Sequence, residues 1–483
     1  MMKSSLSPVT TVNRTAILAI ILVSYVMIVL DTSIVITGLP KIHQELGFSD
    51  AGLSWVANAY TLTFGGFLLL GARAGDILGR RRMLITGLII FTAASIAIGM
   101  AQSPAMLIAG RAVQGVGSAI LAPSSLALLQ TNFPAGPERT RAVSYYASAA
   151  GISASVGLVL GGILADWLSW RVGFFINLPI GLAMILATRR YVAETVPVSG
   201  KFDILGALTS TLGMGALVFG IVRSATEGWT DPLTLQTLVA AGILLAVFVL
   251  TEWRAKQPIM PLRLFASRER VGAYAARFLF LGANVGFFFF STQFMQGVAN
   301  FSPSSAGLAF LPAMIVNFVS ALYLAPKLIK RIGTVRVLMV SMTVGMIGML
   351  MLGQVSTGTT YLGGLLVPML LVGIGQGGAL GPLTTLGIAG VATEDAGAAS
   401  GLVNVAHQIG SSVGLGMLIA AAAHVSTMLT GPDLLTHRVE NAMTAAAVLV
   451  ALALLLAATL IRQPQSHLAS GTGKKTPLSA AQE

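Results

Sequence analysis

The chain has 483 residues, of which 55% are hydrophobic and only 10% are charged. A soluble domain usually carries about 25% charged residues, so this composition indicates an integral membrane protein. The chain has no cysteine, which excludes a disulfide framework, a thiolate nucleophile and a cysteine-based metal site. The formal net charge of +12 could suggest a polyanionic partner, but the positions of the basic residues give it another explanation.

Long apolar segments follow one another along the whole chain. About 20 apolar residues cross the hydrocarbon core of a bilayer as a helix. By that measure the sequence predicts fourteen spans: Ile17–Leu39, Ser54–Gly71, Met83–Met100, Ala105–Gln130, Val143–Ala165, Val172–Thr188, Ile204–Val222, Leu235–Thr251, Val271–Met295, Ala306–Ala325, Val337–Leu352, Tyr361–Gly390, Ala398–Ala423 and Ala442–Ile461. Because the spans near residues 172, 235 and 337 are short, thirteen is the alternative count.

Basic residues set the predicted orientation. Most of the 29 Lys and Arg residues fall in segments that are cytoplasmic if the N-terminus is inside and the number of spans is even. This asymmetry is what the positive-inside rule requires. We therefore expect both termini in the cytoplasm of a multi-pass membrane protein. The net charge then reflects topology, and we expect no nucleic-acid partner.

Two weak internal repeats suggest how the spans are grouped. The turn at Gly79-Arg80 has an echo at Gly333, and Gln114-Gly115 in the fourth span is echoed by Gln376-Gly377 in the twelfth. Two related six-helix bundles with two inserted helices are the parallel-repeat plan of secondary transporters. The expected division is a cytoplasmic N-terminal tail (1–15), an N-terminal bundle (16–190), a linker with the seventh and eighth spans (191–268), a C-terminal bundle (269–462) and a disordered cytoplasmic tail (463–483).

Asp31 is the only one of the 17 acidic residues that is predicted to lie well inside a span. A buried charge costs at least ~2.5–3.5 kcal/mol on insertion scales, so such residues persist mainly where they have a function. A tolerated polar residue that faces other helices is the alternative. Asp31 lies eight residues before Leu39, and Arg111 lies seven residues after Pro104 in the antiparallel fourth span.

Both side chains therefore lie roughly 10–12 Å below the outer surface, because a helix rises by ~1.5 Å per residue. Opposite charges at one depth can neutralise each other, which is the usual condition for burying either. Our hypothesis is that Asp31 is ionised when paired with Arg111 and takes up a proton when the pair opens.

The turn between the second and third spans combines glycine, an acid and arginines. Its candidate functional residues are Asp76, Gly79, Arg80 and Arg81. Glycine permits a tight turn, and an acid can lie against a helix N-terminus. We expect the arginines to form a clasp between the bundles with Glu394 and Asp395, which would act as a cytoplasmic gate. A basic loop that only sets topology is the alternative.

Other polar and small residues within the spans have less specific interpretations. Gly157, Gly161 and Gly162 form a small-residue pattern that lets helices approach closely, and a gating role for them stays open. The candidates for lining a substrate path are Gln114, Asn284, Gln293, Asn317, Gln376, Asn404 and His407. Hydrogen bonds between packed helices are the alternative for each of them. Arg277 lies near the cytoplasmic end of the ninth span and is expected to snorkel towards water.

Patterns for catalysis or nucleotide binding are weak. Gly471–Thr476 faintly suggests a phosphate loop, but the upstream glycine is missing and the segment lies in a polar tail. No H-E-x-x-H, G-x-S-x-G or Cys/His metal-ligand spacing occurs. We expect no enzymatic activity, no cofactor and no metal site, and an ATP-driven pump is disfavoured.

Three ordered motifs resemble those of a known family. Leu30–Pro40 resembles the first-helix motif l-D-x-T-i-V-n-v-A-L-P, Ala72–Arg82 resembles G-x-L-a-D-r-x-G-r-r, and Arg111–Gly117 resembles R-x-x-Q-G-x-G. The chain is similar to the major facilitator superfamily, and within it to the fourteen-helix drug–proton antiporters of the EmrB/QacA type. Leu158 departs from that pattern, because it replaces the proline of the antiporter motif, so the direction of transport depends on overall similarity. Lys330 occupies the position in the second half that corresponds to Asp76, so the second half has no equivalent acid there.

The resemblance implies an all-α major facilitator fold and a proton-coupled multidrug efflux transporter. It would export amphipathic lipophilic or cationic compounds by alternating access. Asp31 and Arg111 would couple protons to substrate, and Asp76, Arg80 and Arg81 would belong to the gate. The expected partners are a small lipophilic molecule, protons and membrane lipid, and we expect a monomer. A proton-coupled symporter or exporter of one metabolite or lipid is the first alternative, and a membrane-integral enzyme is another.

Overall fold

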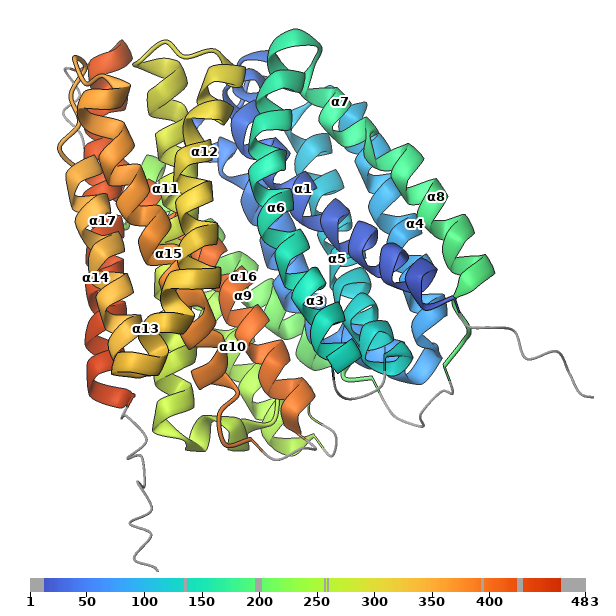
Figure 1. The fold of residues 1–483 in the computed structure, drawn as a ribbon. Helices are drawn as coiled ribbons and strands as arrows, with labels where there is room; N and C mark the ends of the chain where they lie inside the picture. Colours follow the sequence, from blue (N-terminus) through green and yellow to red (C-terminus); the bar gives the residue numbers. More distant parts are fainter. Residues whose placement is uncertain are drawn as a thin grey trace, which may run out of the picture.

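The computed structural model describes residues 13–133, 137–195, 202–255, 258, 260–391, 395–423 and 429–461. The described residues form helices joined by short turns (Figure 1). The N-terminal half consists of α1 (Arg14–Leu46), α2 (Asp50–Leu53), α3 (Trp55–Leu78), α4 (Arg80–Gly99), α5 (Pro104–Asn132), α6 (Pro137–Trp167), α7 (Trp170–Phe175) and α8 (Asn177–Tyr191). These helices pack into one bundle, in which α3 and α4 lie against α5 and α1 lies against α6.

The C-terminal half forms the second bundle. It consists of a 3₁₀ turn at Leu262–Ala266 and of α11 (Arg268–Gly297), α12 (Pro303–Val319), α13 (Ala325–Ile332), α14 (Thr334–Leu352), α15 (Leu366–Gly387), α16 (Ala396–Ala422) and α17 (Gly431–Leu460). Two π-helical segments, Ser320–Leu324 and Tyr361–Leu365, precede α13 and α15. Pro326 lacks an amide hydrogen, which accounts for the irregular turn just before it.

Local signals in the sequence fix where several helices begin. α5, α10 (Pro232–Arg254) and α12 each have a proline at the first helical position. In each, the preceding Ser or Asp side chain accepts a hydrogen bond from a backbone amide of the first turn. Proline costs nothing at this position because that amide has no partner within the helix.

The two inserted helices, α9 (Ile204–Glu227) and α10, pack against each other as a hairpin. α9 contacts α3 of the first bundle and α16 of the second, so the hairpin covers a junction between the bundles. Among the described helices α10 packs mainly against α9, and most of its surface is exposed. Its exposed side chains include Leu235, Val239 and Ile243, which suits a lipid-facing helix.

Thirteen helices of the described residues are long and apolar enough to cross a membrane. The three spans expected to be short are among them, because Trp170–Tyr191, Pro232–Arg254 and Thr334–Leu352 have 22, 23 and 19 residues. The predicted span that has no counterpart among these thirteen is Val143–Ala165, which corresponds to α6, and the described apolar part of α6 is the shorter helix Ile152–Trp167. The count of fourteen therefore stays a prediction that depends on α6, which has 31 residues in all.

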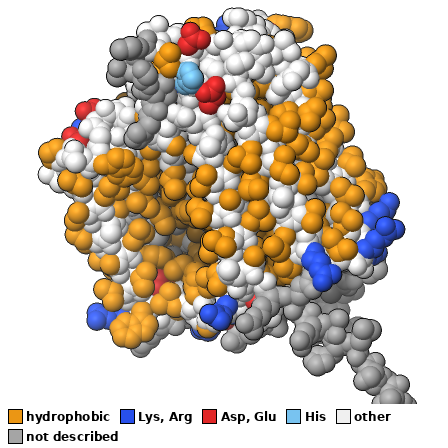
Figure 2. Space-filling model, turned by 90° about the vertical axis from the view of Figure 1, so that its left-hand side faces the viewer, with side chains coloured by type: hydrophobic (Ala, Val, Ile, Leu, Met, Phe, Trp, Pro, Cys, Tyr) orange, Lys and Arg blue, Asp and Glu red, His pale blue; other side chains and the backbone are white. Residues whose placement is uncertain are grey.

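The charge distribution distinguishes the two ends of the molecule. α1 begins and α17 ends in the lower half of Figure 1. On the face shown in Figure 2, Lys and Arg side chains gather at the lower end, and hydrophobic side chains cover most of the height above them. We call the end that carries Arg80, Arg81, Arg263 and Lys330 the basic end. The other end is called the opposite end.

Candidate functional site

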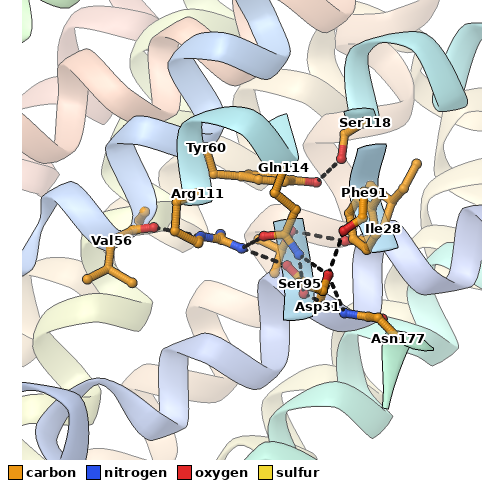
Figure 3. A network of polar contacts seen from close by, with 12 residues as sticks. Ile28, Asp31, Val56, Tyr60, Phe91, Ser95, Arg111, Gln114, Ser118 and Asn177 are labelled. Atoms are coloured by element: carbon orange, nitrogen blue, oxygen red, sulfur yellow. Dashed lines mark hydrogen bonds and ion pairs between the residues drawn. The ribbon is translucent and has the colours of Figure 1, made fainter. Parts of the chain in front are cut away.

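Asp31 lies in the interior of the first bundle, in the middle of α1. Its side chain and that of Arg111 on α5 are each 1% exposed. Nη1 of Arg111 donates to Oδ2 of Asp31 at 2.7 Å, which is the pairing that their matching depth predicts. Figure 3 shows the guanidinium of Arg111 between Asp31 and Val56, whose carbonyl accepts from Nε at 2.9 Å. The buried charges thus neutralise each other, which is the condition for keeping both in a low dielectric.

Amide side chains complete the shell around the carboxylate. Oδ1 of Asp31 accepts hydrogen bonds from Nε2 of Gln114 and Nδ2 of Asn177, each at 2.9 Å. Both amides also donate to the hydroxyl of Ser95, at 2.8 Å and 3.2 Å. The network therefore joins α1, α3, α4, α5 and α8 around one carboxylate (Figure 3).

Close packing of small residues allows this convergence. A methyl group added at Gly115 would lie 2.4 Å from the carbonyl oxygen of Tyr60, so α3 and α5 touch backbone to backbone there. This approach lets Arg111 reach the end of α3. It also places the guanidinium carbon 4.3 Å from the centre of the Tyr60 ring, in the geometry of a cation–π contact.

A cavity of about 1440 Å³ lies between the two bundles. Its walls include Thr32 and Tyr60, which are neighbours of Asp31 and Arg111, and it extends to Asp76 and Asp395 at the basic end. Asp31 itself is behind this wall. The cavity is long, mostly apolar and provided with a few polar groups, as small-molecule sites usually are.

The bundles are in close contact at the opposite end. Gly162 of α6 lies against the carbonyl of Pro303, and a methyl group at Gly307 of α12 would lie 2.5 Å from the carbonyl oxygen of Leu158. Nε2 of Gln296 on α11 donates to the carbonyl of Thr37 on α1 at 3.0 Å. We call these contacts the opposite-end seal. The cavity is therefore accessible from the basic end and closed at the other.

Comparisons with known proteins assign this arrangement to a family. The family model of the Major Facilitator Superfamily matches residues 21–415. The chain belongs to the major facilitator superfamily. Members of this family and the chain's relatives are transporters, so the chain is a transporter and not an enzyme.

Several relatives of known name are similar over most of their length. The cephamycin export protein CmcT of Amycolatopsis lactamdurans is 36% identical over 92% of this chain and 92% of its own. The puromycin resistance protein pur8 of Streptomyces alboniger is 36% identical over 88% of this chain and 84% of its own. The multidrug resistance protein Stp of Mycobacterium tuberculosis is 36% identical over 85% of this chain and 77% of its own.

Solved structures of distant relatives share the fold. A bacterial homologue of the human lysosomal transporter Spinster, in an inward-facing and occupied conformation, matches with a TM-score of 0.65 at 15% identity, over 92% of this chain and 96% of that one. The peptide transporter POT in complex with sulfate matches with a TM-score of 0.66 at 16% identity, over 92% and 95%. At these identities the likeness concerns the major facilitator fold alone.

The turn expected to act as a gate in this major facilitator protein is held by predicted residues together with Glu194, which sequence reasoning missed. Arg80 binds Asp76 at 2.8 Å, four residues earlier, and Gly79 adopts φ +99°, which favours glycine. The carboxylate of Glu194 accepts from the backbone amides of Arg81 and Arg82 at 3.0 and 3.1 Å. Glu194 thereby caps the first turn of α4, where a negative charge is favourable.

The expected clasp between the bundles is not formed by Asp395. Asp395 instead accepts two hydrogen bonds of 2.7 Å from Arg263, which precedes α11 in the same half of the chain. Arg80 and Asp395 both line the cavity at the basic end, and because the cavity is open between them they do not pair. Glu394 lies outside the described residues.

The three glycines of α6 lie at close helix contacts. A methyl group at Gly157 would lie 2.6 Å from Cβ of Ser33, and one at Gly161 would lie 2.5 Å from the carbonyl oxygen of Ile34. Both of these glycines therefore pack against α1, whereas Gly162 packs against the other bundle in the opposite-end seal.

The candidate lining residues divide into two groups. Asn317, Gln376, Asn404 and His407 line the cavity, and Asn317 donates to Gln376 at 2.8 Å. Gln114 does not line it, because its amide is fully buried in the shell of Asp31. Asn284 is buried and donates to the carbonyl of Phe280, and Gln293 is not part of the cavity wall.

Arg277 lies elsewhere than the sequence predicts, and Asn177 is a site residue that the sequence analysis did not name. Arg277 does not snorkel, because it is 7% exposed and its guanidinium forms part of the cavity wall. Asn177 was missed, although the depth argument could have found it. Asn177 lies seven residues after Trp170, the first residue of α7. Arg111 lies the same number of residues after Pro104, the first residue of α5, so the two side chains are expected at the same depth.

Proposed function

We propose that this protein is a proton-coupled efflux transporter that exports amphipathic, lipophilic small molecules by alternating access. The observation that carries the proposal is the Asp31 carboxylate, which is buried, paired with Arg111 and adjacent to the cavity wall. Relatives that are 36% identical are named for antibiotic export and for drug resistance, which supports export as the direction.

The position of Asp31 on α1 supplies a route from protonation to conformation. Protonation of Asp31 would remove the charge that holds Arg111, in a low dielectric where such attraction is strong. Asp31 lies six residues before Thr37, which takes part in the opposite-end seal. Because α1 carries both groups, a change around Asp31 reaches the contacts that close the cavity.

We further propose that the basic end faces the cytoplasm, as the positive-inside rule favours. The structure would then be the inward-facing state, ready to receive a substrate from the cytoplasm or the inner leaflet. Opening of the opposite-end seal would expose the cavity and Asp31 to the outside. The protein would function as a monomer in the bacterial inner membrane, with fourteen spans and both termini inside.

A panel of lipophilic dyes in inverted membrane vesicles tests this function. Vesicles that contain the protein should accumulate dye when a proton gradient is imposed, and a protonophore should abolish the accumulation. Vesicles without the protein provide the control. Accumulation that does not depend on the gradient, or movement only in the uptake direction of the cell, would contradict the proposal.

An exporter of one specific metabolite is the second candidate. It is favoured by relatives named for single compounds, such as the cephamycin export protein and the tetracenomycin C resistance and export protein of Streptomyces glaucescens. The same panel separates the two candidates, because a specific exporter would leave all dyes but close analogues of its own substrate unmoved.

A further inference from the structure

Arg277 of α11 is a buried cation in the cavity wall that no carboxylate of the described residues neutralises. It is 7% exposed, and within the described residues its guanidinium forms no ion pair with an acid. Its two described hydrogen-bond partners are neutral: Nη1 donates to the hydroxyl of Thr384 at 2.9 Å, and Nη2 lies 3.2 Å from Nδ1 of His407. Its Nε is buried without a partner. An arrangement of this kind is costly unless something else supplies the negative charge.

The described acids in or beside the cavity wall are each already paired with an arginine. Asp76 is bound by Arg80, and Asp395 is bound by Arg263, both at the basic end. Asp31 is held behind the wall by Arg111. Deep in the cavity, therefore, the described acids are not free to neutralise Arg277 or to receive a cationic substrate.

His407 adds to the same subsite. An arginine side chain has only hydrogen-bond donors, so Nδ1 of His407 must accept and the ring proton lies on Nε2. The imidazole is neutral in this arrangement and orients Arg277. His407, like Arg277, lines the cavity. Its ring carries a further donor at Nε2.

An aromatic surface lies close to this positive charge. Tyr25 of α1 stacks on Tyr146 of α6 with ring centres 4.0 Å apart, and both line the cavity. Tyr25, Tyr146 and Arg277 all line the same cavity. The cavity thus offers a cationic anchor on one bundle and a flat apolar surface on the other.

We propose that Arg277 and His407 form a subsite for the carboxylate of an amphipathic anionic substrate, whose apolar part packs on Tyr25 and Tyr146. The planar guanidinium matches a carboxylate and binds it more strongly than a neutral group. This inference rests on the proposed function for its statement that the bound anion is transported cargo. The proposed anionic substrate differs from the cationic one that the sequence resemblance implies, because the charge deep in the cavity wall is the positive charge of Arg277.

A matched set of ligands tests the subsite by binding alone. The probes are 1-naphthaleneacetic acid and 1-naphthaleneacetamide, which have nearly the same shape and differ in charge. Their dissociation constants are measured by equilibrium dialysis on the full-length protein in phosphatidylcholine nanodiscs. We expect the acid to bind at least about tenfold more tightly than the amide, because charge-assisted hydrogen bonds are roughly twice as strong as neutral ones.

Variants then assign the preference to the residue. Arg277→Gln should remove the preference by weakening the binding of the acid far more than that of the amide, whereas Arg277→Lys should retain part of the preference. Arg331→Gln is the matched control, because Arg331 is exposed on α13 and does not line the cavity. Equal binding of acid and amide by the wild type, or no saturable binding of the acid, would overturn the inference. So would a preference that survives in Arg277→Gln.

Two further arms separate this inference from its alternatives. Phosphatidylglycerol added to the nanodiscs should leave the affinity for the acid unchanged. If it competes with the acid, the anion held by Arg277 is a lipid head group and the proposed substrate class is wrong. Dye export without any preference for the acid would overturn the subsite and leave the proposed function intact. A preference for the acid without gradient-driven transport would contradict the proposed function and leave the subsite intact.

Discussion

Gly162 of α6 lies so close to Pro303 of α12 that a methyl group on the glycine would overlap the proline carbonyl oxygen. The two residues belong to different bundles and sit at the centre of the opposite-end seal. Glycine at this point lets the backbones touch, which is how small residues support helix association in membranes. The closed state of this end therefore depends on the absence of a side chain at one position.

Replacing Gly162 by alanine should open the seal. Overpacking typically costs about 1–3 kcal/mol, and each 1.4 kcal/mol changes an equilibrium about tenfold. The chain has no cysteine, so Ile36→Cys places a unique thiol in the cavity wall next to the seal. Gly162→Ala should raise the labelling rate of this thiol by a membrane-impermeant maleimide added outside cells by about tenfold.

Gly242→Ala in the same Ile36→Cys background is the matched control. Gly242 lies on α10, and a methyl group there would meet nothing within 4 Å. Labelling should be unchanged in this variant. An unchanged rate in Gly162→Ala, with the protein present in the membrane, would show that the close contact does not control access.

Asn177 should be needed for coupling although it does not face the cavity. Asn177→Ala removes one of the two amide donors to Oδ1 of Asp31, and a lost hydrogen bond to a buried charge costs about 1.5–3 kcal/mol. We expect gradient-driven transport in proteoliposomes to fall about tenfold or more. Asn132→Ala is the control, because Asn132 bonds only within the end of α5. Wild-type transport by Asn177→Ala would exclude this role.

Depth along a helix could be predicted from the sequence, but contacts between faces could not. The rise per residue places Asp31 and Arg111 at one level, and the structure brings them within 2.7 Å. The same arithmetic applies to Asn177. Arg277 was misjudged because the distance to a helix end does not show which side chains lie beside the guanidinium, and here Thr384 and His407 bind it inside the protein.

Loop contacts were the other limit of sequence reasoning. Whether Asp395 binds an arginine of the first bundle or Arg263 depends on how far the bundles are apart at the basic end. That separation belongs to a conformational state, and a sequence specifies more than one such state for the alternating-access transporter that we propose. Helix ends and small-residue contacts, by contrast, follow from local composition.

The Arg263–Asp395 pair should stabilise the protein over a defined pH range. The hydrogen bonds from Arg263 hold the pKa of Asp395 below its ordinary value of 3.8. A carboxylate whose pKa is lowered by folding stabilises the protein above its ordinary pKa and loses that contribution as the pH falls through the lowered value. Arg263→Gln and Asp395→Asn should therefore each lower the thermal unfolding temperature from about pH 5 to 8.

The difference from the wild type should shrink only when the pH falls below 3.8. The measurement is thermal unfolding of the purified protein in detergent across this range, with Arg331→Gln as the exposed control. A difference that disappears between pH 6 and 7 would mean that another titrating group governs the effect.

In the proposed mechanism Asp31 carries the coupled proton. The most direct measurement is accumulation of a transported compound in proteoliposomes, with and without an imposed pH gradient, by the wild type and Asp31→Asn. Asp433→Asn is the matched control, because Asp433 is exposed in the first turn of α17. We predict that Asp31→Asn binds the compound and exchanges it across the membrane, but does not accumulate it when the gradient is imposed. Gradient-driven accumulation by Asp31→Asn at the wild-type level would contradict the account.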